Sequence, residues 1–376
     1  MSGKSDKKKP LVPRLRFPEF REAGAWEVKE LSAALAYAQP TPFIVSTEQY
    51  GTSGTPVLTA GKTFILGHTS EDFGIYERVP VIIFDDFTTE AKFVDFPFKV
   101  KSSAIKILSP RPGYSLKFVL EAIISIQFDA SQHKRHWIGE FQHLKIPFPP
   151  PKEQQKIAHC LSSLDEVIGL QAKKVQALKQ HKKGLMQQLF PAEGETTPRL
   201  RFPEFREAGA WEVKRLGEVC IICNGSSNAQ DHVDDGAYPL FDRSEEIKRS
   251  SRYLFDAEAV IIPGEGMRFI PKYYCGKFDL HQRAYALSDF REVGKFIYYQ
   301  LGALKGVLAS KAVMSTVLSL RMPILETFKL VIPSSGEQQK IAHCLSSLDE
   351  VIGLESHKLD ALKNLKKGLM QQLFPQ

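Results

Sequence analysis

Apolar residues recur at alternating steps of four and three along two long stretches of this chain. The stretches run from Glu153 to Pro191 and from Glu337 to Pro375, and equivalent residues are 184 positions apart. A 3.5-residue repeat held over about five heptads is typical of a coiled-coil seam. Each helix is expected to be roughly 55 Å long at 1.5 Å per residue, so we interpret the pair as a spacer. The apolar positions are Ile157, Leu161, Leu164, Ile168, Val175, Leu178, Leu185 and Leu189, then Ile341, Leu345, Leu348, Ile352, Leu359, Leu362, Leu369 and Leu373.

Polar residues interrupt both seams, at Gln171, Lys182, Glu355 and Lys366. Parallel pairing in equal register would set Lys182 against Lys366, where like charges repel. Antiparallel pairing with residue numbers that sum to 537 places Gln171 opposite Lys366 and Lys182 opposite Glu355. Because a polar interruption commonly determines register, we expect that antiparallel pair. The alternative is two unrelated surface helices with solvated lysines.

A 17-residue segment, PRLRFPEFREAGAWEVK at 13–29, recurs letter for letter at 198–214. Its proline and glycine residues surround an aromatic set, Phe17, Phe20 and Trp26 in the first copy. This composition favours a strap that is fixed against the protein over a free linker. The order of strap, block and helix occurs twice, so we expect the two chain ends to meet where the halves would otherwise be joined.

Two blocks of similar length, 30–151 and 215–336, lie between strap and helix and barely resemble each other. Each mixes strand-like and helix-like runs and ends on a short apolar strand leading into prolines, which suit the residues ahead of a helix. We expect an α+β fold with domains at 1–151, 152–191, 192–336 and 337–376. The strand-like runs are Val79–Phe84, Ala104–Leu108, Ala259–Ile262 and Ala284–Leu287, and the helix-like runs are Leu116–Ile126 and Val293–Lys305.

The net charge of +7 does not lie in the two blocks. Residues 1–29 and 152–190 each carry a surplus of +4, whereas blocks 30–151 and 215–336 carry −1 and +1. Net charge alone is therefore weak support for nucleic-acid binding. No run approaches 18 apolar residues, and Met1–Pro10 lacks the apolar centre of a signal peptide, so a cytoplasmic location is expected.

The five cysteines include one CxxC pair, Cys220 and Cys223. This pair has neither a second pair nor a counterpart in the first half, so buried apolar thiols are favoured over a zinc site. Cys160 and Cys344 are repeat copies on the long helices.

Two unlike blocks alternate with two near-identical regions, and each block runs through P-x-x-x-EQQKIA into a long helix. With the paired RLRFPEF…WE straps, this pattern resembles the specificity (S) subunits of type I restriction-modification systems over essentially the whole chain. The resemblance implies that each block is a target recognition domain, which reads one half of an asymmetric bipartite DNA target. It also implies that the antiparallel coiled coil, with a pseudo-two-fold circular organisation, sets the spacer between the half-sites.

The resemblance further implies two methyltransferase (modification) subunits docked on the conserved regions, and restriction subunits that join the complex. It places S-adenosylmethionine in the methyltransferase partner and ATP with Mg²⁺ in the restriction partner, and none of these in this chain. The alternative is a stand-alone tandem DNA-binding or scaffold protein without methyltransferase partners.

Basic residues of the two blocks, with the cluster at 133–137, are the candidates for contacts with double-stranded DNA. A basic–aromatic cluster ahead of a strand suits phosphate and base-edge contacts, and arginine suits bidentate contacts with guanine. The alternative for each is a solvated side chain. The candidates are Lys62, Lys92, Lys99, Lys101, His133, Lys134, Arg135, His136 and Trp137, then Arg243, Lys248, Arg249, Arg252, Arg268, Lys272, Lys277, His281 and Arg283.

The chain is expected to be non-catalytic. Methyl transfer to a base amino group would need an Asn/Asp-Pro-Pro-aromatic loop, and the prolines at 149–151 have no Asn or Asp before them. A nuclease site at Asp85, Asp86, Glu90 and Lys92 is the alternative. It is disfavoured because the gap from Asp86 to Glu90 is too short to place these residues on the usual separate strands, and the second half has no equivalent.

Overall fold

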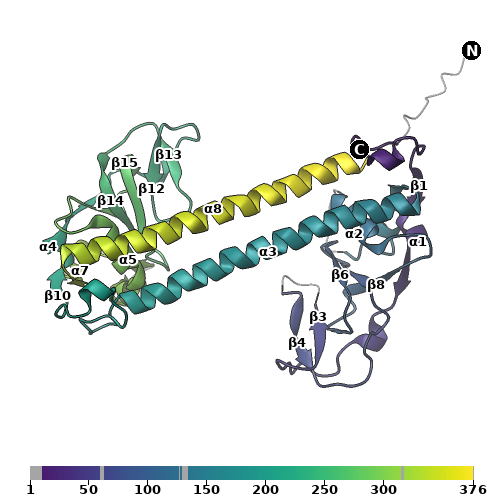
Figure 1. The fold of residues 1–376 in the computed structure, drawn as a ribbon, viewed down its shortest axis with the longest axis horizontal. Helices are drawn as coiled ribbons and strands as arrows, with labels where there is room; N and C mark the ends of the chain where they lie inside the picture. The colour runs from purple at the N-terminus through teal and green to yellow at the C-terminus, as the bar shows by residue number, and fades with distance from the viewer. Residues whose placement is uncertain (1–10, 60–62, 127, 129–133, 315–316, 376) are drawn as a thin grey trace, which may run out of the picture. The chain divides into compact units, whose positions relative to one another are not determined.

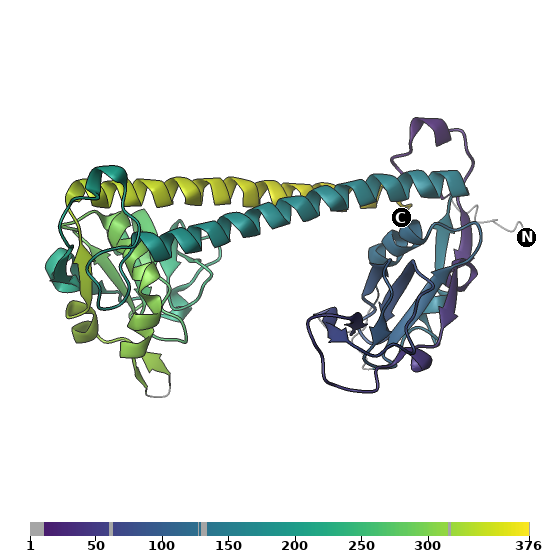
Figure 2. The ribbon, with the colours of Figure 1, turned by 60° about the horizontal axis from the view of Figure 1, so that its bottom comes forward.

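The computed structural model describes residues 11–59, 63–126, 128, 134–314 and 317–375. The chain forms two compact units: unit 1 comprises Met1–Gln171 with Lys358–Gln376, and unit 2 comprises Ala172–His357. Each unit contains one strap, one variable block and part of each long helix (Figures 1 and 2). Unit 1 and unit 2 are described separately below.

Both predicted long helices form, as α3 (Pro151–Leu189) and α8 (Ser335–Leu373), each of 39 residues. The chain of α3 leaves unit 1 after Gln171, and the chain of α8 enters unit 1 at Lys358. None of the helices in the described ranges is long and apolar enough to cross a membrane.

The two helices run antiparallel within each unit, as expected. In unit 1, Lys366 Nζ lies 2.8 Å from Asp165 Oδ2, while Ile157 and Leu373 share one apolar cluster. In unit 2, Lys174 Nζ lies 2.6 Å from Glu355 Oε1, whereas Lys182, further along α3, contacts Asp349, which precedes Glu355 in α8. Residue numbers therefore fall along α8 as they rise along α3.

The expected register is wrong by about one heptad. Lys182 Nζ lies 2.5 and 2.7 Å from the carboxylate of Asp349 rather than opposite Glu355, and Lys366 contacts Asp165 rather than lying opposite Gln171. These pairs sum to 531, not 537. A heptad seam looks alike after a shift of seven, and acidic residues beside the seam neutralise its lysines.

The variable block of unit 1 folds around a four-stranded antiparallel sheet in the order β2 (Leu35–Ala38), β8 (Ile105–Pro110), β5 (Val81–Asp85), β6 (Ala91–Val94). Helix α2 (Leu116–Ser125) contributes its buried face to the same core, and the Ser115 side chain caps its first turn. The predicted strands and helix of this block are confirmed. Smaller elements are η1 (Pro18–Phe20), α1 (Leu31–Ala34), η2 (Thr41–Phe43), η3 (Phe141–His143) and a second sheet of β4 (Ile65–Thr69), β3 (Thr55–Leu58) and β7 (Lys99–Val100).

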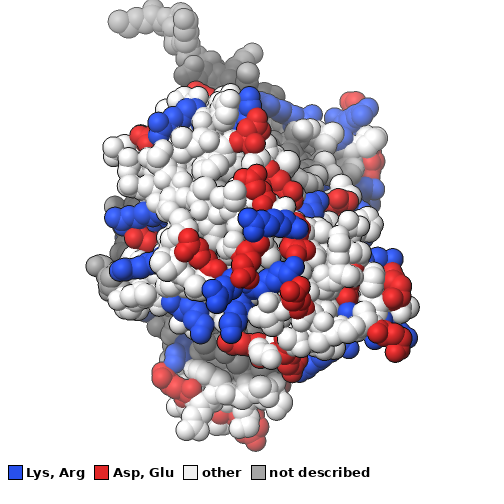
Figure 3. Space-filling view, turned by 90° about the vertical axis from the view of Figure 1, so that its left-hand side faces the viewer, with Lys and Arg blue, Asp and Glu red and all other residues white. Residues whose placement is uncertain are grey.

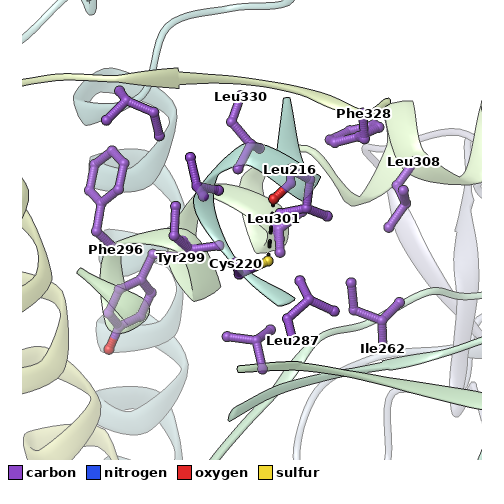
Figure 4. Close-up of a cluster of buried hydrophobic side chains, with 14 of the residues drawn as sticks. Leu216, Cys220, Ile262, Leu287, Phe296, Tyr299, Leu301, Leu308, Phe328 and Leu330 are labelled. Atoms are coloured by element: carbon purple, nitrogen blue, oxygen red, sulfur yellow. Dashed lines mark hydrogen bonds between the residues drawn. The ribbon is translucent and has the colours of Figure 1, made fainter. Parts of the chain in front are cut away.

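The variable block of unit 2 has a different sheet, of six strands in the order β11-β16-β14-β15-β12-β13. Its main core lies between this sheet, the helix α5, the end of the strap and the start of α8 (Figure 4). The predicted strands and helix are again confirmed. The elements are η4 (Pro203–Phe205), α4 (Leu216–Val219), β11 (Ile221–Asn224), η5 (Ala229–Asp231), β12 (Tyr238–Phe241), β13 (Lys248–Ser250), β14 (Phe255–Pro263), β15 (Lys272–Leu280), β16 (Ala284–Ser288), α5 (Gly294–Ala303), α6 (Lys305–Lys311), β17 (Val313–Met314), β18 (Leu318–Ser319) and α7 (Met322–Glu326).

Each strap ends in a strand that pairs with the last strand of its block. β1 (Glu27–Glu30) pairs antiparallel with β9 (Lys145–Phe148), and β10 (Glu212–Arg215) pairs with β19 (Lys329–Ile332). β9 continues through Pro147, which a two-stranded ribbon tolerates because a proline there need not donate to a further strand. The straps are therefore fixed, as predicted.

The carboxyl end of the chain meets the strap of unit 1. Leu15 N–H donates to the Gln372 carbonyl at 3.0 Å, and in unit 2 Leu200 N–H donates to the Gln188 carbonyl at the same distance. In Figure 1 the C mark accordingly lies beside the purple strap. The expected meeting of the ends is confirmed within unit 1.

Candidate DNA- and partner-binding sites

The duplicated Glu of EQQKIA holds the strap in each unit. Arg16 binds Glu153 through two parallel hydrogen bonds of 2.8 and 2.7 Å, and Arg201 binds Glu337 through two of 2.9 and 2.6 Å. All four side chains are buried. A buried bidentate pair has strict geometry, so it determines how the strap crosses the start of the long helix.

The following Gln holds the variable block. Gln154 Oε1 accepts from Ser115 N–H, the cap of α2, at 2.9 Å, while its Nε2 donates to the Pro149 carbonyl at 2.9 Å. In unit 2, Gln338 bonds Val293 N–H and the Pro333 carbonyl, again at 2.9 Å. The two unlike blocks are thus mounted on their helices through the same contacts.

An aromatic set completes this attachment. We call the whole attachment the clasp; it comprises the strap, the start of the long helix and the first turn of the helix in the variable block. Trp26 lies 5.8 Å from Phe118 and 6.2 Å from Phe374 between ring centroids. Its copy Trp211 lies 5.8 Å from Phe296 and 6.4 Å from Phe190. The clasp therefore repeats in its hydrogen bonds and in its aromatic packing.

Large apolar side chains on the long helices remain exposed at matching positions of the two copies. Val167 and Leu170 in unit 1 are 47% and 67% exposed, and their copies Val351 and Leu354 in unit 2 are 41% and 70% exposed. We call these two pairs the helix patches. They lie within the identical sequence SLDEVIGL, and the seam periodicity singled out the neighbouring half-buried positions instead. Exposed leucines at equivalent sites indicate a repeated contact surface.

Several candidates of the second block come together at one end of the six-stranded sheet. Arg283 Nη1 lies 2.9 Å from both carboxylate oxygens of Glu265, and Arg243 lies 3.9 Å from the same carboxylate. Both arginines stay more than half exposed. We call this end, which includes Lys248 and His281, the cationic rim.

The rim carries its charge on arginine and lysine. Burial lowers the pKa of His281 below its ordinary value, and the nearby Arg283 and Arg243 lower it further against the opposing effect of Asp242. The imidazole is therefore uncharged at neutral pH. Although burial opposes it, the 2.7 Å ion pair with Lys248 lowers the pKa of Asp242, so that carboxylate stays ionised.

The other candidates of this block have partners within the same block. Arg252 Nη2 donates to Ser227 Oγ at 2.9 Å and Arg249 Nε donates to the Gly236 carbonyl at 2.8 Å. Lys272 Nζ donates to the Ser244 carbonyl at 2.6 Å, and burial lowers its pKa. Lys277 lies over the ring of Tyr253, and Arg268 is 76% exposed beside Glu245. Arg321, exposed directly before α7, was missed because no motif surrounds it.

Three candidates of the first block are buried, which corrects their expected role as direct DNA contacts. Lys99 is fully buried between Glu71 at 2.8 Å and the Phe73 carbonyl at 2.7 Å. His136 and Trp137 are each 1% exposed. In the cluster at 133–137, His136 and Trp137 therefore pack into the core of the block instead of forming part of an exposed recognition loop.

Four candidates of the first block reach the surface: Lys92, Lys101, Lys134 and Arg135. Arg135 Nη2 donates to Ser103 Oγ at 2.9 Å, and Lys134 pairs with Glu140. Lys62 and His133 lie outside the described residues.

The acidic residues of the nuclease alternative have structural roles. Asp86 forms a buried 3.0 Å ion pair with Lys106, and Asp85 Oδ1 accepts from Phe87 N–H at 2.9 Å in the following turn. Within the ranges that the structure describes, no group of His, Cys, Asp and Glu is arranged to hold a metal ion. Cys220 Sγ instead donates to the Leu216 carbonyl at 3.3 Å inside the unit 2 core (Figure 4).

Surface charge is mixed. On the face shown in Figure 3, basic and acidic side chains are interspersed, and one group of basic side chains lies in the lower centre of the face. This agrees with the near-neutral charge of the variable blocks.

Comparisons with known proteins give one consistent result. The family model described as the type I restriction modification DNA specificity domain matches residues 81–180 and 209–364. The specificity subunit of the type I restriction enzyme EcoR124I/EcoR124II of Escherichia coli is 32% identical over 350 residues, which cover 83% of this chain and 84% of that one. A putative MjaX specificity subunit of Methanocaldococcus jannaschii is 25% identical over 62% of this chain and 59% of its own.

The fold has a solved counterpart. The crystal structure of a type I restriction-modification system S subunit from M. genitalium aligns with a TM-score of 0.70 at 17% identity, over 97% of this chain and 100% of that one. The family match, the relatives and the fold agree with the resemblance drawn from the straps and EQQKIA helices. The chain belongs to the type I restriction-modification specificity family, and is the non-catalytic DNA specificity subunit of such a system.

Proposed function

We propose that each variable block reads one half of an asymmetric bipartite DNA target. The observation that carries this proposal is the repeated clasp: two unlike blocks are mounted on equivalent helix starts by the same Arg–Glu and Gln contacts. Because the same contacts attach two blocks of different sequence, each block is suited to recognise a different DNA sequence. The antiparallel coiled coil sets the distance between half-sites, in the way that dimer spacing does in other DNA-binding proteins.

The blocks bind DNA mainly through basic side chains that reach the surface. In the second block these are Arg243, Lys248 and Arg283 of the cationic rim, with Arg268 and Arg321 beside it. The first block contributes Lys92, Lys101, Lys134 and Arg135. Such residues supply phosphate contacts, and arginines of the rim also reach base edges.

The helix patches dock two copies of a methyltransferase subunit, which carries S-adenosylmethionine. Two equal surfaces on one chain fit a partner that is present twice. Restriction subunits, which use ATP and Mg²⁺, join through that complex.

The test is methylation-sensitive sequencing of host DNA with the chain in complex with its methyltransferase partners. We expect one split motif with modified adenines. Exchange of residues 30–151 for another such block should change one half of the motif and leave the other half and the gap intact. Removal of seven residues from each long helix should instead change the gap.

Two results would overturn the proposal. One is sequence-specific binding by the chain as a lone monomer that does not co-purify with a methyltransferase, as a stand-alone DNA-binding or scaffold protein would show. The other is a motif in which both halves change after the exchange of a single block.

A further inference from the structure

A tight turn between β15 and β16 brings three polar side chains to the cationic rim: His281, Gln282 and Arg283. Ala284 N–H donates to the His281 carbonyl at 2.9 Å and closes the turn. Gln282 and Arg283 are exposed, and His281 is half-buried. We call residues 281–284 the HQRA turn. Its side chains are open to a partner from solvent.

The backbone of the HQRA turn is held by neighbouring segments of the block. Its first two N–H groups donate to the carbonyls of Phe241 and Ser227, each at 2.9 Å. The Arg283 carbonyl accepts from Gly264 N–H at 2.8 Å, and a Cβ at Gly264 would lie 2.5 Å from that carbonyl. Glycine is therefore required for this close approach. An exposed turn on a rigid backbone suits recognition, because a binding side chain must be held in one geometry.

Arg283 is braced by Glu265 and keeps one edge of its guanidinium open. Its Nη1 donates to both carboxylate oxygens of Glu265 at 2.9 Å, while the side chain stays more than half exposed. Among the described residues, no hydrogen bond involves its Nε or Nη2. The N–H groups of these two nitrogens run parallel, so they can donate to two acceptors of one group at once.

Charge distinguishes a base contact from a phosphate contact at Arg283. The pair of Arg283 and Glu265 has no net charge, and the Glu265 carboxylate would repel a phosphate that approached it. The acceptors on a base edge are uncharged and meet no such repulsion. Arg243, which is 3.9 Å from Glu265 and more exposed, is better placed to neutralise a neighbouring phosphate.

The other groups of the turn also present donors. Arg283 N–H donates to His281 Nδ1 at 3.1 Å, so the proton of the neutral imidazole lies on Nε2. Gln282 Nε2 donates to Asn228 Oδ1 at 2.6 Å, which orients its amide. Guanine is the base that shows two acceptors, N7 and O6, and no donor in the major groove. A surface of parallel donors matches that edge.

We propose that the HQRA turn faces the DNA major groove and that Arg283 donates from Nε and Nη2 to N7 and O6 of a guanine in the half-site read by the second block. Glu265 is the positioning residue for this contact. An arginine with two hydrogen bonds to guanine is the commonest specific contact between protein and DNA. This inference rests on the proposed function and adds the residue and the base that it recognises.

The experiment measures the affinity of the full complex of this chain and its methyltransferase partners for DNA duplexes at several salt concentrations. The duplexes carry the sequenced target, or the same target with one guanine of the second half-site replaced by 7-deazaguanine, which lacks the N7 acceptor. The main variant is Arg283→Lys, which keeps the charge but loses the parallel N–H groups. Arg291→Lys is the matched control, because Arg291 is an exposed arginine of the same block that donates to the Glu218 carbonyl at 3.0 Å.

We expect 7-deazaguanine at one position to weaken binding by the unchanged complex about tenfold, in the range of one lost base contact. Arg283→Lys should weaken binding to the unmodified target by a similar factor, and 7-deazaguanine at that position should then have little further effect. The salt dependence of Arg283→Lys should not change, because its charge is kept. The control should bind like the unchanged complex.

A second variant, Glu265→Ala, tests the positioning role. It should lower the preference for guanine over 7-deazaguanine, because Arg283 is no longer held in one orientation. It should also steepen the salt dependence by about one counterion, because the arginine charge is no longer neutralised. A residue that only maintained the fold would not change that slope.

The inference is overturned by a second half-site without a G·C pair, by equal binding of guanine and 7-deazaguanine duplexes, or by unchanged affinity of Arg283→Lys. An effect of 7-deazaguanine that persists in full in Arg283→Lys would assign the guanine to another residue and also overturn it. An unchanged salt slope in Glu265→Ala would overturn the positioning role. Failure of the proposed function looks different, since the unchanged complex would then yield no split motif at all.

Discussion

Glutamate in place of Leu170 or Leu354 should remove one methyltransferase subunit at a time. The two leucines are the most exposed members of the helix patches, at 67% and 70%. Full burial of a leucine side chain is worth about 1.5–3 kcal/mol, so docking that covers the exposed two thirds gains about 1–2 kcal/mol. That gain corresponds to roughly 5- to 30-fold in Kd. A buried, unpaired carboxylate adds a further penalty of several kcal/mol.

The assay is the mass of the purified complex, measured by native mass spectrometry and light scattering. The unchanged chain should carry two methyltransferase subunits, Leu170→Glu or Leu354→Glu one, and the double variant none. Folding should be almost unaffected, because substitution of an exposed side chain usually changes stability by less than about 0.5 kcal/mol. Gln180→Glu is the control, because position 180 is exposed on α3 and its copy is a different residue, Asn364.

Two results would refute the reasoning. Single variants that retain two subunits at concentrations near the unchanged Kd would show that the helix patches do not contact the partner. Single variants that lose both subunits at once would show that the two patches form one shared site rather than two equal ones.

Three further predictions test the structure itself. Arg16→Leu leaves Glu153 buried without its partner, so unit 1 should lose about 3 kcal/mol of stability, seen as faster amide exchange in the strap; unchanged exchange would contradict the buried pair. Lys182→Glu should lower the free energy of unfolding by about 1 kcal/mol, and the added change Asp349→Lys should restore it; no rescue would argue against the observed register. Burial raises the pKa of Cys220 to about 12, so its thiol should stay protonated and resist alkylation at pH 9, while the exposed Cys275 reacts; equal labelling of both by peptide mass mapping would contradict this.

Repetition in the sequence predicted most of the architecture. The 3.5-residue seams, the copied straps and the proline-terminated strands are local patterns, and local patterns depend on backbone geometry that neighbouring residues determine. The α3 and α8 helices, their antiparallel direction within each unit and the β1–β9 and β10–β19 pairings therefore agree with expectation.

Candidate DNA contacts were harder to identify, because a basic residue looks the same in sequence whether it is buried or exposed. Lys99 and Trp137 have the composition of a recognition loop, yet Lys99 forms a buried ion pair and Trp137 lies in the core.

The sequence by itself determined the family, the two-fold repetition and the long helices, because each is written in duplicated or periodic residues. Only the tertiary structure decided the register of those helices and the make-up of the cationic rim. The seam repeats every seven residues, so several registers bury it equally well, and the choice falls to Asp165 and Asp349 beside it. Arg243, Glu265 and Arg283 of the rim are far apart in sequence, and they come into contact only because the strands of the sheet pair.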